Sequence, residues 1–344
     1  MNTSEVVVIT GASAGVGRAI VHEFARHGAR IGLLSRNRET LDKVKQEVEA
    51  LGGQALVLVT DVADANAVEH AADLVESAFG PIDIWINNAM ASMVSPALEM
   101  TADEFRRVTE VTYLGYVHGT LAALRRMQPR NRGAIVQVGS ALAYRSIPLQ
   151  SAYCGAKHAI KGFTEALRCE ILHDRLNIRL NMVQLPAVNT PQFDWIRSRM
   201  PNQPQPVPPI YQPEIIARSV YWSAHHDRRE MLVGITTVRA VWAEKFFPGL
   251  IDRYLAKAGY ASQQTDEPVA ADRQDNLMQP VMKDFGAHGR FDKEAIRFSL
   301  QAWLGRHRNE VLGGLAALTS AGATYLWMSS KRVQNHKVAQ LERH

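Results

Sequence analysis

The stretch Val6 to Gly17, VVVITGASAGVG, decides the fold, because a short apolar β-branched run leads directly into a glycine-rich turn. An uninterrupted run of this kind is typical of a strand buried on both faces. Glycines lack Cβ atoms, so backbone N–H groups and the start of the following helix can come close to an anion. The stretch predicts a phosphate-binding turn, although an ordinary strand-to-helix turn has a similar composition. The predicted binding residues are Gly11, Ser13, Ala14, Gly15, Val16 and Gly17.

Similar short runs alternate with amphipathic stretches along the first 240 residues or so. Leu41, Val44 and Val48 show the spacing of one apolar helix face. Thr101-Ala-Asp-Glu104 has the form of a capping box, which begins a helix running towards Met127. The alternation predicts an α/β fold with a doubly wound parallel sheet. The predicted elements are strands at Val6–Thr10, Ile31–Ser35, Ala55–Val59, Ile82–Asn87, Ala134–Gly139, Ile178–Leu185 and Leu232–Val238, with a helix at Pro213–His225.

The end of the second predicted strand indicates which dinucleotide the turn binds. An NAD-binding chain is expected to place an acidic residue there, against the ribose hydroxyls. This chain instead has Leu34-Ser-Arg-Asn-Arg38, with a hydroxyl at Ser35 and guanidinium groups at Arg36 and Arg38. Guanidinium groups bind phosphate through charge-assisted, bidentate hydrogen bonds, so the segment favours NADP(H). Arginines at a solvated helix entrance would give the same residues without that role.

Tyr153 and Lys157 are the candidate proton-transfer pair. A spacing of four on a helix places the phenol and the ammonium on one face, one turn apart. A nearby cation favours phenolate and lowers the pKa of a tyrosine, which suits a general acid and base. Ser140 follows the predicted strand Ala134–Gly139, and ligands bind at the carboxyl ends of strands in open α/β sheets. A serine in that position can also be a simple turn cap.

In order and spacing, these motifs resemble those of the short-chain dehydrogenase/reductase family, which has a Rossmann fold. The resemblance covers about Val6 to Val238. The motifs that carry it are Thr10-Gly-x-x-x-Gly-x-Gly17, Asp61-Val62, Asn87-Asn88-Ala89, Ser140 and Tyr153-x-x-x-Lys157.

The resemblance also implies roles for these residues. Ser140 would orient a carbonyl, Tyr153 would exchange the proton, and Lys157 would bind the nicotinamide ribose. The further cofactor contacts that it implies are Asp61 and Val62 beside adenine, Asn88 and Ala89 in a supporting turn, and Pro186, Val188 and Thr190 beside the nicotinamide carboxamide.

Three positions depart from the family pattern. Thr112 stands where the family usually has an asparagine that holds a water linking the lysine to solvent. A threonine hydroxyl can also hold a water, so Thr112 is kept as a candidate catalytic residue. Met90 and Ala187 replace glycines, which narrows the space near the nicotinamide and predicts selection of substrates by shape.

The composition limits the partners of this 344-residue chain. Its net charge of +5 comes without long Lys/Arg runs, so we expect no nucleic-acid binding. The two cysteines, Cys154 and Cys169, suggest neither a disulfide framework nor a metal cluster, and no metal is expected. Because Met1 to Thr10 lacks the pattern of a secretory signal, we expect a cytoplasmic protein. The family resemblance implies a homo-oligomer.

The chain beyond the predicted sheet has a different character. We expect the catalytic domain to cover 1–258, an extended tail or linker to cover 259–305, and a terminal helix to cover 306–344. Val311 to Met328 contains no charged side chain, with small residues along one stripe. This pattern leaves two interpretations open, a membrane anchor or a helix packed on a partner subunit.

These patterns favour an NADP(H)-dependent oxidoreductase that interconverts a carbonyl and an alcohol. A Pro-rich substrate loop near 187–212 and residues of other segments would line a cleft for a bulky lipophilic substrate. The alternatives are an NAD-linked alcohol dehydrogenase and a weakly catalytic, cofactor-binding or scaffolding protein of the same fold. The expected lining residues are Met90, Met93, Leu142, Tyr144, Phe193, Trp195, Met200 and Tyr211.

Overall fold

The computed structural model describes residues 4–270, 272–311, 313–314, 319–321, 323–325 and 327–328. Within these residues, a parallel sheet of seven strands has the order β10-β7-β6-β4-β1-β2-β3. The order reverses at β1, so the sheet is doubly wound and the predicted fold class is confirmed. The strands are β1 (Val6–Thr10), β2 (Arg30–Ser35), β3 (Gln54–Val59), β4 (Ile84–Asn87), β6 (Gly133–Val138), β7 (Ile178–Gln184) and β10 (Glu230–Leu232).

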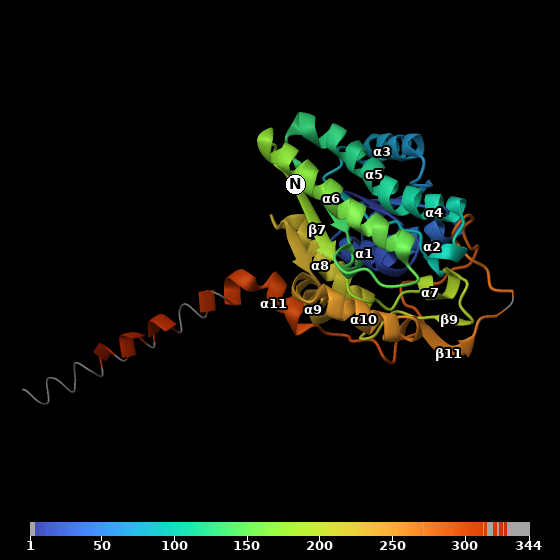
Figure 1. Cartoon of the computed structure of the whole chain (residues 1–344). Helices are drawn as coiled ribbons and strands as arrows, with labels where there is room; N and C mark the ends of the chain where they lie inside the picture. The colour runs from blue at the N-terminus through green and yellow to red at the C-terminus, as the bar shows by residue number, and fades with distance from the viewer. Residues whose placement is uncertain are drawn as a thin grey trace, which may run out of the picture. The chain divides into compact units, whose positions relative to one another are not determined.

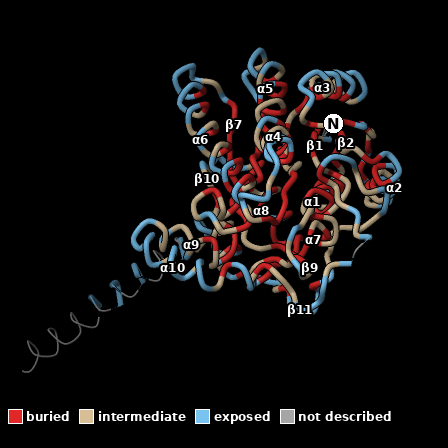
Figure 2. The backbone as a smooth tube through the Cα atoms, turned by 45° about the vertical axis from the view of Figure 1, so that its right-hand side comes forward, coloured by how far each residue is buried: buried red, intermediate tan, exposed pale blue. Residues whose placement is uncertain are grey.

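Helices cover both faces of the sheet, and Figure 1 shows α3, α5 and α6 on one side with α1 and α8 on the other. The sheet is buried between these layers, as the red strands and pale blue outer helix surfaces of Figure 2 show. The helices are α1 (Gly15–Arg26), α2 (Arg38–Ala50), α3 (Ala65–Phe79), α4 (Ala102–Thr109), α5 (Gly115–Met127), α6 (Ser151–His173), α7 (Gln192–Trp195), α8 (Pro213–His225), α9 (Ile235–Phe246), α10 (Pro248–Ala258) and α11 (Leu300–Arg306).

The helix predicted from the capping box is present, with one irregularity. Thr101 accepts a hydrogen bond from the Glu104 N–H, and the Glu104 carboxylate accepts one from the Thr101 N–H. A π-helical turn at Glu110–Leu114 separates α4 from α5. This turn contains Thr112.

The predicted strand at Leu232–Val238 is wrong over most of its length. β10 ends at Leu232, and α9 begins at Ile235. Gly234 adopts φ +80°, a left-handed conformation that ends the strand and redirects the chain. The β-branched residues that follow therefore form a helix, because tertiary packing overrides their local preference.

Short strands outside the main sheet order the substrate loop. β5 (Met93–Val94) pairs with β8 (Arg197–Ser198), and β9 (Asn202–Pro204) pairs antiparallel with β11 (Gln264–Pro268). β11 lies in the segment that we expected to be an extended tail. The chain from Met1 to Ser299 forms one compact unit, so the expected boundary at residue 258 falls inside it.

The segment after β11 is irregular, but it is packed on the sheet and its helices. Leu277 is 0% exposed and belongs to the same apolar core as Trp85 and Ile135. In Figure 1 this orange segment runs from β11 up towards α2 and α4. The expected extended linker is therefore a structural part of the first unit.

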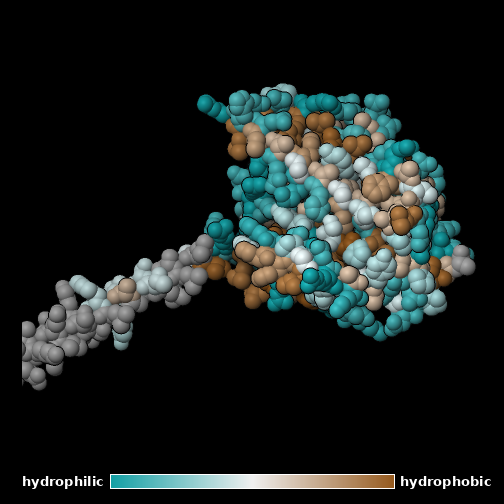
Figure 3. All heavy atoms as spheres, in the orientation of Figure 1, coloured by the Kyte–Doolittle hydropathy of each residue, from teal (hydrophilic) through white to brown (hydrophobic). Residues whose placement is uncertain are grey.

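Helices α9 and α10 keep a group of large apolar side chains on the surface. Figure 3 shows apolar surface around these two helices. Singly exposed apolar residues are common on proteins, whereas a gathered group is less usual. The exposed residues are Trp242, Phe246, Phe247, Leu250 and Tyr254.

The described residues from Leu300 onward belong to a second unit, which contains α11. In the predicted terminal helix, residues 312, 315–318, 322, 326 and 329–344 lie outside the described residues. No helix among the described residues is both long and apolar enough to cross a bilayer.

We predict that Leu277→Ala lowers the free energy of unfolding by about 2–4 kcal/mol, because it leaves a cavity in a closed core. Met278→Ala is the matched control, since its side chain is 37% exposed, and it should cost less than about 0.5 kcal/mol. Urea unfolding of the full chain measures both values. Equal, small effects would show that this segment is not part of the cooperative core.

Candidate active site

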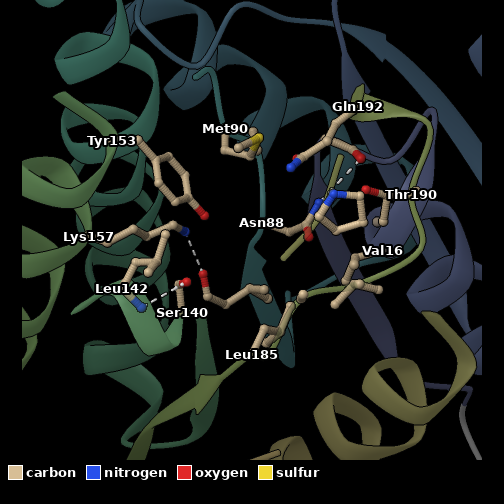
Figure 4. A pocket seen from close by; sticks show the side chains of 18 of the residues that line it. Val16, Asn88, Met90, Ser140, Leu142, Tyr153, Lys157, Leu185, Thr190 and Gln192 are labelled. Carbon is tan, nitrogen blue, oxygen red and sulfur yellow. Dashed lines mark hydrogen bonds between the residues drawn. The ribbon is translucent and has the colours of Figure 1, made fainter. Parts of the chain in front are cut away.

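A cavity of about 420 Å³ opens at the carboxyl ends of the parallel strands. Ligand sites of open α/β sheets are expected at this edge. Its walls include all the predicted cofactor-binding residues except Arg38, together with Ser140 and Tyr153. In Figure 4, Ser140, Tyr153 and Lys157 lie on one side of the cavity and Val16, Asn88 and Thr190 on the other. The structure thus brings together residues that are well separated in the sequence, such as Val16 and Ser140, which are 124 positions apart.

The glycine-rich turn has no room for side chains at two of its glycines. Gly11 adopts φ +67°, and a Cβ there would lie 2.8 Å from the Ala89 Cα. A Cβ on Gly17 would lie 2.0 Å from the Gly11 carbonyl oxygen. The Asn88 side chain holds the turn by donating to the Thr10 and Gly11 carbonyls at 3.0 and 3.3 Å. Glycine is therefore required for the close packing that shapes this turn.

The two arginines after β2 have different surroundings. Arg36 lines the cavity beside Ser35, and Ser35 donates a hydrogen bond to the Ser13 hydroxyl at 2.9 Å. Arg38 is not among the lining residues, and its side chain is 70% exposed beside Asp42. The structure therefore places Arg36 at the predicted phosphate site and leaves Arg38 outside it.

Asp61 is held at the cavity edge by hydrogen bonds. Its carboxylate accepts from Arg107 at 2.6 Å and from the Ala63 N–H at 3.0 Å. These bonds keep the pKa of the Asp61 carboxyl below its usual value, although burial acts in the opposite direction. Asp61 is therefore a fixed anion beside the cavity.

Ser140 directly follows β6, and its backbone is anchored from β7. The Ser140 N–H donates to the Gln184 Oε1 at 2.7 Å, and the Gln184 Nε2 donates to Glu230 at 2.8 Å. The Ser140 Oγ accepts the Leu142 N–H at 3.1 Å, and its hydroxyl hydrogen donates to the Tyr153 oxygen. The serine is thus oriented as a hydrogen-bond donor within the cavity.

Tyr153 and Lys157 lie one turn apart on α6, as predicted, with the Lys157 Nζ 5.6 Å from the centre of the Tyr153 ring. Burial raises the pKa of the Tyr153 phenol, while a hydrogen bond with Ser140 acts in the opposite direction. Burial also lowers the pKa of Lys157 to about 7. Burial outweighs the hydrogen bond to Ser140, so the pKa of Tyr153 lies above its usual value, and a lowering of that pKa by Lys157 stays a prediction.

The Thr112 side chain bonds to the backbone of Ala91, and its expected role as the fourth catalytic residue stays a prediction. Its hydroxyl donates to the Ala91 carbonyl at 2.7 Å and accepts the Ala91 N–H at 2.9 Å. The hydroxyl that Lys157 contacts is that of Tyr116, at 3.2 Å. Lys157 also donates to the Val138 carbonyl at 2.9 Å. Thr112 lies in the π-helical turn. No motif of the sequence indicated that Tyr116 would contact Lys157.

The expected substrate lining is present in part. Met90, Leu142, Phe193 and Trp195 line the cavity. The other four expected residues are engaged elsewhere. Met93 is in the core, Met200 packs near Leu149, Tyr211 packs beside Gly234, and Tyr144 donates a hydrogen bond to Glu230.

Sequence reasoning missed the part of the site that comes from the far end of the chain. Asn276 lines the cavity, and residues near it contact the glycine-rich turn and the end of β2. The segment has a polar composition that favours a tail, and only the apolar pair Leu277–Met278 hints at packing.

Comparisons with known proteins agree with this geometry. Residues 5–200 match the family model described as short chain dehydrogenase. An uncharacterized oxidoreductase of Bacillus subtilis, YxnA, is 32% identical over 77% of this chain and 75% of its own length. A 3-dehydrosphinganine reductase of Danio rerio is 33% identical over 62% of this chain and 66% of its own length.

A solved structure is also similar. It is an alcohol dehydrogenase from the archaeon Thermococcus sibiricus, complexed with 5-hydroxy-NADP, which is 26% identical with a TM-score of 0.58. The similarity covers 67% of this chain and 96% of that one.

We predict that Lys157 makes the stability of the protein depend on pH. Its folded pKa of about 7 is below the usual value of 10.5, so between these values the unfolded chain binds a proton that the folded chain does not. The free energy of unfolding should therefore rise with pH, by about 2 kcal/mol between pH 7 and 9. This rise should be absent in Lys157→Met.

Urea unfolding at pH 7, 8 and 9 measures this difference between the wild-type and variant chains. Lys161→Met is the control, because Lys161 is one turn further along α6 and pairs with Glu165 at 2.9 Å. The assignment fails if the wild-type chain and Lys157→Met show the same dependence on pH.

Proposed function

The chain belongs to the short-chain dehydrogenase family of oxidoreductases, and we propose that it interconverts a carbonyl and an alcohol with NADP(H). The observation that carries the proposal is the single cavity shared by the glycine-rich turn and by Ser140, Tyr153 and Lys157. One wall fits the phosphates of a dinucleotide, and the other presents a hydroxyl, a phenol and a buried amine. Both reacting partners can therefore meet in the same enclosed space.

A bound nicotinamide dinucleotide supplies the hydride that adds to the carbonyl carbon, or accepts it in the reverse direction. Ser140 donates a hydrogen bond to the carbonyl oxygen, and Tyr153 transfers its proton to that oxygen as negative charge develops. The raised pKa of Tyr153 keeps the phenol protonated and ready to donate in this direction. Lys157 exchanges protons near neutral pH, since burial lowers its pKa to about 7.

Three features support a preference for NADP(H). No acidic residue occurs between Leu34 and Arg38. Arg36 lines the cavity together with Ser13 and Ser35. The similar Thermococcus sibiricus structure is described as a complex with 5-hydroxy-NADP. Together they favour a 2′-phosphate over an unmodified ribose.

The cavity wall around Tyr153 favours a bulky lipophilic substrate. Met90, Leu142, Ile147 and Phe193 are among its lining residues, and an apolar lining with a few polar groups is usual for ligands of that kind. Relatives of this chain include proteins named 3-dehydrosphinganine reductase and fatty acyl-CoA reductase. Their names indicate long-chain substrates, which supports the same class here.

Assembly and membrane contact remain predictions. The expected homo-oligomer can be tested by light scattering of the purified full chain. Flotation with lipid vesicles tests membrane contact through the terminal segment. A single monomeric mass would contradict the homo-oligomer. Recovery of all the protein away from the vesicles would contradict membrane contact.

We predict that Tyr153→Phe lowers turnover by about 10²–10⁴-fold, because general acid catalysis contributes about that much. NADPH binding should be nearly unchanged, since the ring remains. Tyr254→Phe is the control, because that side chain is 67% exposed.

NADPH consumption with a panel of ketones and aldehydes measures turnover, and fluorescence titration measures binding. If Tyr153→Phe keeps wild-type turnover, the assigned proton donor is wrong. Tight NADPH binding by the wild-type chain without turnover on any carbonyl would favour the scaffolding alternative.

We predict that Arg36→Gln reduces the preference for NADPH over NADH by about 10- to 100-fold, which corresponds to one charge-assisted hydrogen-bonding group. Arg38→Gln should change the preference little, because Arg38 does not line the cavity. Dissociation constants for both cofactors give the result. A wild-type chain that prefers NADH would support the NAD-linked alternative.

A further inference from the structure

A segment near residue 280 is far in sequence from the glycine-rich turn and from Tyr153. In the structure it covers the edge of the cavity where Arg36 lies, which we call the cofactor edge. We call residues 276–286 the C-terminal strap. Arg36 donates to the Asn276 and Met278 carbonyls at 2.5 and 3.0 Å. Arg107, on α4, donates to the Leu277 carbonyl between them at 3.1 Å. Three successive carbonyls of the strap are thus held by arginines of the cofactor edge.

The second half of the strap is tied to α1, α2 and the glycine-rich turn. The Asp284 carboxylate pairs with Arg18 at 2.5 Å and with Lys43 at 3.7 Å. The Gly15 N–H donates to the Gly286 carbonyl at 3.0 Å. Ion pairs and backbone bonds therefore fix both sides of Lys283, which lies next to Asp284.

A second, small cavity of about 80 Å³ lies between the strap and the turn. Ser13, Ser35 and Arg36 line both this cavity and the larger one. The strap contributes Lys283 and Phe285, and the Lys283 Nζ lies 5.1 Å from the centre of the Phe285 ring. The cavity therefore continues the larger one on the side where the end of β2 meets the turn.

The charges around the small cavity suit an anion. Arg36 and Lys283 are its cationic lining residues, and none of the described residues that line it is acidic. The nearest acid in sequence, Asp284, is engaged by Arg18 and Lys43. Three hydroxyl-bearing residues, Ser13, Ser35 and Thr40, and two cations around a small space match the oxygens and charge of a phosphate monoester.

We propose that Lys283, from the C-terminal strap, binds the 2′-phosphate of NADP(H) together with Arg36. The proposal rests on the proposed NADP(H) preference and adds a residue from outside the region matched by the family model, which ends at residue 200. The strap is then part of the cofactor site as well as of the core. A dinucleotide without the 2′-phosphate gains nothing from Lys283.

The test uses two small probes that separate the phosphate from the rest of the cofactor. Adenosine 2′,5′-bisphosphate carries the 2′-phosphate, and adenosine 5′-monophosphate lacks it. Calorimetry with the full chain should show that Lys283→Gln weakens binding of the bisphosphate by about fivefold, as expected for one partly exposed ionic contact. Binding of the monophosphate should not change.

Two further variants control for structure. Lys283→Arg keeps the charge and should recover most of the affinity for the bisphosphate. Lys293→Gln removes an exposed lysine ten positions along the same segment and should behave as the wild-type chain.

The binding of the two probes by these variants distinguishes the possible roles of Lys283. If Lys283→Gln binds the bisphosphate as tightly as Lys293→Gln does, Lys283 is not a phosphate ligand. An equal loss for both probes would show that Lys283 supports the strap and does not contact the phosphate, which also overturns the proposal. A wild-type chain that binds both probes equally would instead refute the NADP(H) preference itself. These results separate failure of the inference from failure of the proposed function.

Discussion

Parallel pairing of the strands is the constraint on which the rest of the structure depends. Because β1 pairs in parallel with both β2 and β4, and β6 with both β4 and β7, all these strands end at one edge. Polar residues that follow the strands have no ladder partners and must meet there. The glycine-rich turn after β1 and Ser140 after β6 share a cavity for this reason. Backbone hydrogen bonds between the strands therefore bring the residues of the site together.

This constraint explains why so much could be predicted from the sequence. Apolar runs, glycine spacing and the Tyr153–Lys157 pair are local signals, and parallel pairing converts their order along the chain into positions at one edge. The failures involve long-range contacts that local patterns do not encode. Tyr116 reaches Lys157, and the strap packs Leu277 into the core. Polar composition correctly predicted irregular backbone in the strap but could not show that Arg36, just after β2, and Arg107 of α4 would hold its carbonyls.

The amine of Lys157 shows how the fold alters the chemistry of a group. A buried ammonium loses its hydration, which favours the neutral amine and lowers the pKa to about 7. Two acceptors, the Val138 carbonyl and the Tyr116 hydroxyl, remain for its N–H groups. They are too few to replace bulk water, but they fix the amine below the Tyr153 ring. The fold therefore gives up stability at this position and gains a group that exchanges protons near neutral pH.

The strap connects the cofactor edge of the cavity to the apolar core of the first unit. Leu277 is anchored in the core, while the neighbouring carbonyls bind Arg36 and the Asp284 carboxylate binds Arg18. A ligand that binds Arg36 must keep or replace the hydrogen bonds between Arg36 and the strap carbonyls. Its binding free energy therefore includes the free energy of any change in those bonds. By the same linkage, a ligand that also binds Lys283 would hold the strap closed and add its binding free energy to the stability of the folded chain. The residues after β11 hold the Arg36 guanidinium, so they belong to the proposed mechanism of cofactor selection.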